Sequence, residues 1–195
     1  MTSATEKNRD TQVPLEKKLD DLYKLIDGIE MAMITTRRAD GHLVSRAMAT
    51  QRRTSGSDLW FVTNVESEKF EEIARDPHVN VSYYKDRTRE WVSVSGKAIL
   101  SRDRDLIDSL YAPDWKMWFG DEGDGKRNGG PHDPRIGLIL VEADTVHYSK
   151  KDRTTPMVLF QMAKSMITGE PPKVADLREI GPDELHQPRK SADLR

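Results

Sequence analysis

The sequence LWFVTNVESEKF, residues 59–70, joins an apolar run to an amphipathic run through a polar turn. The apolar run is typical of a strand, and the second run predicts a helix that carries Ser67 and Lys69 in its first turn. Backbone N–H groups at a helix start have no partner within the helix, and the helix dipole adds partial positive charge there. A hydroxyl and an ammonium beside them predict an anion site, with phosphate as the natural guest. The plainer interpretation is that both side chains only cap and solvate a surface helix.

Outward from this stretch, short apolar runs separated by polar turns predict an antiparallel sheet. The Asp40-Gly41 pair is a hairpin signal, and consecutive strands joined by short turns pair in antiparallel fashion. Closing such a sheet into a barrel removes its exposed edges. We therefore expect a mostly β protein with flanking helices, built on a six-stranded antiparallel barrel. The predicted strands are 31–36, 42–50, 59–63, 78–84, 90–100 and 135–149.

Helical spacing of apolar residues and the positions of prolines predict the helices and the ends of the domain. We expect one domain over residues 14–168, a flexible tail at 1–13 and a polar tail or arm at 169–195. The Gly-rich stretch at 120–134 is expected to be a flexible lid or linker, since it lacks the Gly-Lys-Ser/Thr ending of a phosphate-binding P-loop. The predicted helices are 14–29, 67–75, 102–111 and 157–167.

Composition narrows the classes of function. The chain has 195 residues, 31 basic against 33 acidic, and a net charge of −2, which argues against a nucleic-acid partner. It has no cysteine, its five histidines show no metal-ligand spacing, and its apolar runs are strand-length. We expect no metal, no membrane and a cytoplasmic location. Any redox chemistry would have to reside on a bound cofactor.

Several short motifs occur together in a fixed order: MITT at 33–36, SRAM at 45–48, WFVTN with SEK at 60–69, Asp76-Pro77, and VSG at 94–96. In this order they resemble the pyridoxamine 5'-phosphate oxidase-like superfamily of FMN-binding split barrels. Members of that superfamily are usually homodimers with the flavin at the subunit interface.

A later segment is similar to one branch of that superfamily. The run WKMWFG at 115–120, Asp133-Pro134 and a strand ending in His147-Tyr148 resemble the bacterial general stress proteins. The resemblance covers residues 15–150 and implies FMN as cofactor, with FAD as an alternative. It also implies a set of cofactor-binding residues, in which a strand lies along the flavin, a second strand meets the ring edge or ribityl chain, and Ser-x-Lys holds the phosphate. These residues are Arg46, Ala47, Met48, Phe61, Val62, Thr63, Ser67, Lys69, Trp115 and Trp118.

Two of these assignments have plainer alternatives. Trp115 and Trp118 are three residues apart and would share one face of a helical turn, where they either cover the flavin ring by stacking or plug one end of the barrel. Arg46 offers a cationic fork suited to phosphate or to the flavin ring, but it could also pair with a surface carboxylate.

Two functional hypotheses remain open. The first is an FMN-binding protein of the general stress type, in which hydride or electron transfer occurs at the flavin ring with NADH or NADPH as a candidate donor. The second is a non-enzymatic binder of FMN, FAD or another planar cofactor such as haem or a deazaflavin. A vitamin B6 oxidase ranks below both, because the chain has neither the family's Gln near Trp91 nor its basic, His-containing C-terminal motif. No catalytic side chain is identified.

Overall fold

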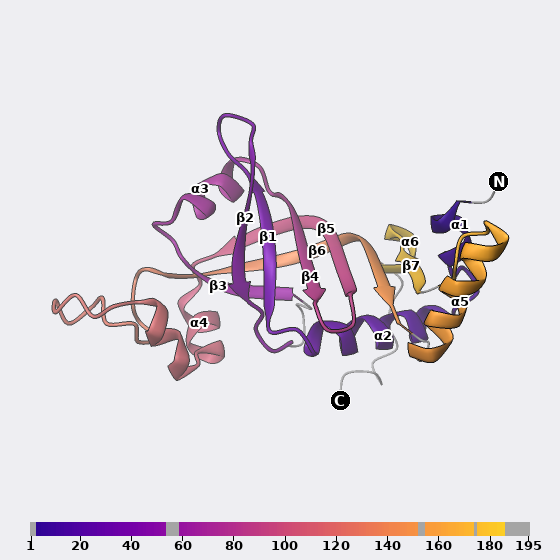
Figure 1. Cartoon of the computed structure of the whole chain (residues 1–195). Helices are drawn as coiled ribbons and strands as arrows, with labels where there is room; N and C mark the ends of the chain where they lie inside the picture. Colours follow the sequence, from indigo (N-terminus) through magenta and orange to yellow (C-terminus); the bar gives the residue numbers. More distant parts are fainter. Residues whose placement is uncertain (1–2, 54–58, 152–154, 174, 186–195) are drawn as a thin grey trace.

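The computed structural model describes residues 3–53, 59–151, 155–173 and 175–185, and its centre is an antiparallel sheet (Figure 1). Residues 54–58, between the predicted strands 42–50 and 59–63, and the end of the predicted arm, 186–195, lie outside the described residues. The strands are β1 Met31–Arg37, β2 Leu43–Ala49, β3 Leu59–Asn64, β4 His78–Lys85, β5 Glu90–Ser101, β6 Ile136–Lys150 and β7 Asp176–Ile180. The helices are α1 Ala4–Asn8, α2 Leu15–Asp27, α3 Glu68–Arg75, α4 Arg104–Leu110, the 3₁₀ turn η1 Pro113–Trp118, α5 Thr155–Thr168 and α6 Pro182–Leu185.

The sheet has the order β2-β1-β4-β5-β6-β3, with β7 beside the second half of β6. Its two outer strands, β2 and β3, approach each other without forming a ladder. One backbone bond joins the chain after β2 to β3, from Gln51 N–H to the Trp60 carbonyl at 3.3 Å. The architecture is therefore a split barrel, as predicted. It has seven strands where the sequence predicts six.

The strands alternate buried and exposed side chains as a half-buried sheet requires. In β4, Val79, Val81 and Tyr83 are buried in the core. The β5–β6 ladder changes register at Gly96, where an added Cβ would lie 2.0 Å from the Glu142 carbonyl oxygen. Only glycine fits that close approach of two backbones.

The apolar core divides into two clusters. The larger cluster lies between α2 and the sheet, and α2 contributes Leu22, Leu25 and Ile26 to it. The smaller one lies at the other end, where Trp60 packs with Trp115 beneath α4 and η1. The second cluster places η1 beside the split in the barrel.

Both segments predicted as tails contain ordered elements, which corrects that prediction. The Asp10 N–H bonds the Leu177 carbonyl at 2.8 Å, and Asn8 bonds backbone groups near β7. Arg178 of β7 pairs with the buried carboxylate of Asp21 on α2. Strand β7 lies beside β6 (Figure 1). Its sequence is polar because ion pairs hold it as well as the sheet, so no apolar pattern predicted it. In the described part of the chain, no helix is long and apolar enough to span a membrane.

Candidate functional site

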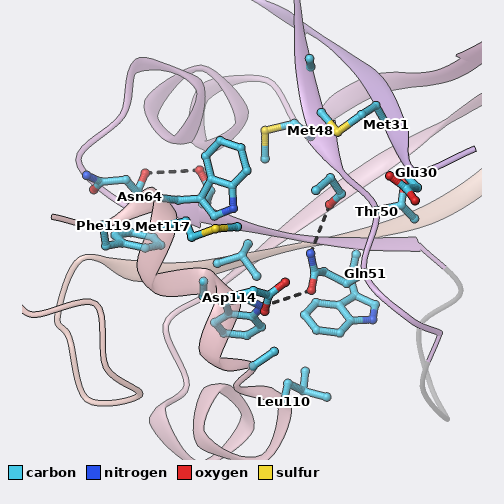
Figure 2. Close-up of a pocket in the computed structure, with 18 of the residues that line it drawn as sticks. Glu30, Met31, Met48, Thr50, Gln51, Asn64, Leu110, Asp114, Met117 and Phe119 are labelled. Atoms are coloured by element: carbon cyan, nitrogen blue, oxygen red, sulfur yellow. Dashed lines mark hydrogen bonds between the residues drawn. The ribbon is translucent and has the colours of Figure 1, made fainter.

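A cavity of about 900 Å³ opens at the split in the barrel, between the end of β2 and strand β3 (Figure 2). The first turn of α3 and the segment around η1 complete its wall. The volume lies within the range of about 300–1,000 Å³ that ligand pockets occupy. The cavity is lined by Glu30, Met31, Ala47, Met48, Ala49, Thr50, Gln51, Arg52, Trp60, Val62, Thr63, Asn64, Lys69, Leu110, Ala112, Asp114, Trp115, Met117, Trp118 and Phe119.

Lys69 is the cation of this pocket on α3. Its Nζ lies 3.4 Å from the Ser67 hydroxyl. It forms no ion pair with any carboxylate of the described residues. The nearby carboxylates of Glu68 and Glu72 pair with Arg46 instead. Burial lowers the pKa of Lys69, the charge of Arg46 lowers it further, and Glu72 opposes these effects. A half-buried ammonium without its own carboxylate is stabilised by an incoming anion.

The turn before α3 leaves the helix start available. Ser67 is the N-cap residue, but its hydroxyl donates to the Asn64 carbonyl at 2.6 Å and makes no capping bond to the helix. The Thr63 hydroxyl lies 3.5 Å from that of Ser67. The first N–H groups of α3 therefore have no side-chain cap, and with Lys69 they offer hydrogen-bond donors to an anion, although Glu68 and Glu71 lie in the same turn.

Arg46 is paired with groups of the protein itself. Its guanidinium makes two bonds to the buried carboxylate of Glu72, at 2.7 and 3.0 Å, and a third to the Thr36 hydroxyl at 3.0 Å. The hydrogen bond to Glu72 raises the pKa of Arg46, and the same bond lowers the pKa of Glu72. Arg46 is not among the residues that line the cavity. The arrangement matches the plainer alternative, pairing with a carboxylate, and ties β2 to α3.

The other wall of the cavity is apolar and aromatic. Trp115 is 1% exposed and donates its indole N–H to Gln51 Oε1 at 3.2 Å, whereas Trp118 is 69% exposed. Both line the cavity, although they differ in burial. Met117 and Met48 add polarizable thioethers from opposite sides (Figure 2). A planar ring would find stacking and thioether contacts here.

The structure brings most of the predicted site residues together. Those that line the cavity are Ala47, Met48, Val62, Thr63, Lys69, Trp115 and Trp118. Those that do not are Arg46, Ser67 and Phe61. Phe61 is fully buried in the larger core cluster, because it alternates with Val62 along β3 and so points to the opposite face. Ser67 contacts the cavity through three residues of its wall, Thr63, Asn64 and Lys69.

The residues that follow β2 were missed by sequence reasoning. Thr50, Gln51 and Arg52 line the cavity because the chain leaves β2 there and crosses towards β3. The Gln51-Trp115 hydrogen bond joins residues 64 apart in the sequence, so no local pattern shows it. Asn64 was within reach of prediction, since it ends the strand that contributes Thr63.

The side chains of the site indicate binding more than acid–base chemistry. Among the described residues, Glu30 and Asp114 are the carboxylates that line the cavity, and none of the lining residues is a histidine. Among the described residues, no group of three or more His, Asp or Glu side chains is placed to hold a metal ion.

A split barrel with a pocket between its outer strands places the protein in the split-barrel class of folds. The chain belongs to the family described as pyridoxamine 5'-phosphate oxidase like, whose profile matches residues 17–173. It is 42% identical over 186 residues to protein bli-3 of Neurospora crassa, covering 94% of this chain and 89% of that protein.

Two solved structures share the fold. One is a protein related to general stress protein 26 from Clostridium acetobutylicum, with a TM-score of 0.61 and 15% identity over 88% of this chain and 99% of that one. The other is a pyridoxamine 5'-phosphate oxidase-related, FMN-binding protein from Nostoc punctiforme, with a TM-score of 0.54 and 16% identity over 71% and 85%. The family profile thereby confirms the resemblance to this superfamily, and both structures share the split-barrel fold.

Proposed function

We propose that this protein binds FMN in the cavity at the split, with the phosphate at the start of α3 and the ring against the wall that contains η1. The observation that carries the proposal is Lys69, a half-buried ammonium without a carboxylate partner, across a cavity from an aromatic wall. Membership of the family and the FMN-binding relative from Nostoc punctiforme support it.

The residues present fit the parts of such a ligand. Lys69 and the uncapped N–H groups of α3 suit a phosphate dianion. Gln51 and Asn64 offer amide groups to the hydroxyls of a ribityl chain, and Met48 with Trp118 offers apolar contact to a ring. The chain supplies binding, orientation and exclusion of water, whereas a bound flavin supplies hydride or electron transfer. NADH or NADPH is the proposed donor.

We propose further that two copies of the chain associate and cover the ring end of the cavity between them. The cavity mouth exposes apolar side chains, among them Met117 at 76%. Helix α5 is mostly apolar, although it also carries Gln161 and Lys164, and many of its large apolar side chains are exposed, which is typical of a surface that another molecule covers. Its exposed large apolar residues are Met157, Leu159, Phe160, Met162, Met166 and Ile167.

A non-enzymatic flavin binder is the second candidate. Among the described residues that line the cavity there is no histidine, the side chain whose ordinary pKa lies nearest neutral pH, and this favours the second candidate. FAD in place of FMN is part of this candidate.

The experiment is an absorption spectrum of the purified protein, followed by anaerobic addition of NADPH or NADH. A yellow protein that releases a fluorescent flavin on denaturation supports flavin binding, and bleaching by a nicotinamide cofactor supports an oxidoreductase. A stable yellow colour without bleaching favours the binder. A colourless protein that cannot be loaded with FMN or FAD refutes both.

A further inference from the structure

We infer that a buried ion pair in the Gly-rich loop, Asp133 with Arg135, positions the aromatic wall of the cavity. We call residues 112–119 the wall segment and the Asp133–Arg135 pair the clamp. The inference rests on the proposed function for its ligand, but its structural half stands on the contacts of the clamp. In this inference the loop acts as a strap on the wall segment, in place of the flexible lid or linker predicted at 120–134.

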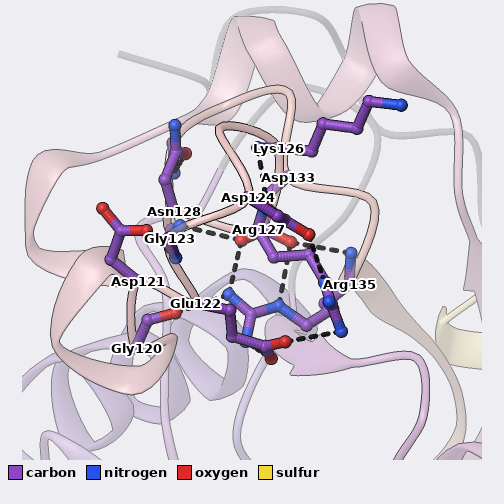
Figure 3. A network of polar contacts seen from close by, with 12 residues as sticks. Gly120, Asp121, Glu122, Gly123, Asp124, Lys126, Arg127, Asn128, Asp133 and Arg135 are labelled. Carbon is purple, nitrogen blue, oxygen red and sulfur yellow. Dashed lines mark hydrogen bonds and ion pairs between the residues drawn. The ribbon is translucent and has the colours of Figure 1, made fainter.

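The two side chains of the clamp are hydrogen-bonded to each other (Figure 3). Asp133 is 0% exposed and Arg135 is 6% exposed, and they share two bonds, Nε to Oδ1 at 3.1 Å and Nη2 to Oδ2 at 2.7 Å. Burial favours a higher pKa for Asp133, but hydrogen bonds from Arg135 and from the Gly129 N–H outweigh it and hold that pKa at about 2. Both partners are therefore charged at neutral pH.

The clamp holds the wall segment from its far end. Arg135 Nη2 donates to the Gly120 carbonyl at 2.7 Å, directly after Phe119. The guanidinium also lies 5.8 Å from the centre of the Phe119 ring, within reach of a cation–π contact. The buried side chain of Arg135 thus fixes the position of the end of the wall segment.

A second tether holds the start of the wall segment. Asp133 Oδ2 accepts the Gly129 N–H at 2.7 Å, and the Gly129 carbonyl accepts the Tyr111 hydroxyl at 3.0 Å. Gly129 has φ of +70°, and a Cβ there would lie 2.9 Å from the Phe119 carbonyl oxygen, so the loop backbone packs directly on η1. Both ends of the wall segment are therefore connected to one carboxylate, Asp133.

The outer part of the same loop provides a matched control. Arg127 pairs with Asp124 at 2.7 Å, and the two side chains are 41% and 34% exposed. Arg127 makes no bond to the wall segment. Breaking this pair removes an ion pair from the loop and leaves the two Asp133–Arg135 bonds in place, and Arg127 is linked to the clamp only through Glu122, which also pairs with Arg135 (Figure 3).

The test compares Arg135→Lys and Tyr111→Phe with the control Arg127→Lys. Lysine cannot bond Asp133 and the Gly120 carbonyl with a planar fork, and phenylalanine removes only the hydroxyl that reaches Gly129. The first readout is amide hydrogen exchange of the apo protein. We expect exchange in residues 112–119 to be about tenfold faster in both clamp variants and unchanged in the control. The second readout is FMN affinity, which should fall about threefold to tenfold because the ligand then has to order the wall.

Equal exchange in residues 112–119 for all three variants and the wild type overturns the inference, as does unchanged FMN affinity in both clamp variants. If Arg135→Lys does not fold, Tyr111→Phe decides the same question. If wild-type protein binds no FMN, the proposed function fails while the exchange experiment still decides the structural half.

Discussion

Replacing Lys69 with methionine is the sharpest perturbation of the proposed phosphate site. The amine has no carboxylate partner within the described residues, so its removal breaks no ion pair in the free protein. Methionine keeps the length of the apolar stem. We therefore expect the free energy of unfolding to stay the same or to rise slightly, because burial penalises the charged form of Lys69.

The effect on ligand binding should be large by comparison. A hydrogen bond to a charged group contributes about 1.5–3 kcal/mol, which corresponds to a loss of about 10-fold to 150-fold in FMN affinity. Riboflavin lacks the phosphate, so its affinity should change little. The variant thus separates loss of a phosphate contact from general damage to the cavity.

The pH dependence gives an independent check. The pKa of Lys69 in the free protein is lowered from 10.5, and a bound phosphate would raise it again. FMN affinity should therefore be highest while the amine is protonated and should fall as the pH rises past the lowered pKa. Lys69→Arg keeps its charge at all these pH values and should show a flat profile by comparison.

The assay is fluorescence titration of flavin with apo protein, supported by thermal unfolding of each variant. An Lys69→Met variant that folds normally and binds FMN as tightly as the wild type would refute the reasoning. A fall in riboflavin affinity equal to the fall in FMN affinity would also contradict it, because the lost contact would not involve phosphate.

Three further predictions concern the scaffold. Glu72→Gln should lower the free energy of unfolding by about 3 kcal/mol at neutral pH, because it breaks a buried ion pair with Arg46. The pKa of Glu72 is lowered from 4.5 in the folded state, so the stabilisation is complete above pH 4.5 and is lost as the pH falls through the folded value. In urea unfolding, the free energies of unfolding of the variant and the wild type should therefore converge in acid. Gly96→Ala should cost about 1–3 kcal/mol by the same assay, because its Cβ would meet the Glu142 carbonyl at 2.0 Å; an unchanged midpoint would contradict the register of β5 on β6. Phe160→Glu should shift the molar mass measured by light scattering from two chains towards one, and a wild-type protein that is already a monomer would exclude the proposed association.

The antiparallel sheet and the turn before α3 could be predicted from the sequence because their sequence patterns are local. Strand β4 alternates regularly, and α3 begins after a polar turn at the position that Ser67 predicts. The interpretation of Arg46 could not be settled locally, because its partner Glu72 lies on another element 26 residues away. Sequence spacing placed Arg46 on the right strand but could not show that a carboxylate already occupies its fork.

The C-terminal strand was missed for a related physical reason. Arg178 is only 5% exposed although it is charged, because Asp21 on α2 and Asp10 near the N-terminus neutralise it. Sequence patterns assign such polar segments to solvent. Ion pairs between residues more than 150 positions apart are visible only in the fold.

The measurement that tests the central claim most directly is the ratio of the dissociation constants of riboflavin and FMN for the wild-type protein. The account predicts that FMN binds at least about tenfold more tightly than riboflavin, because Lys69 and the uncapped start of α3 contact its phosphate. Equal affinities, or no binding of either flavin, would contradict it.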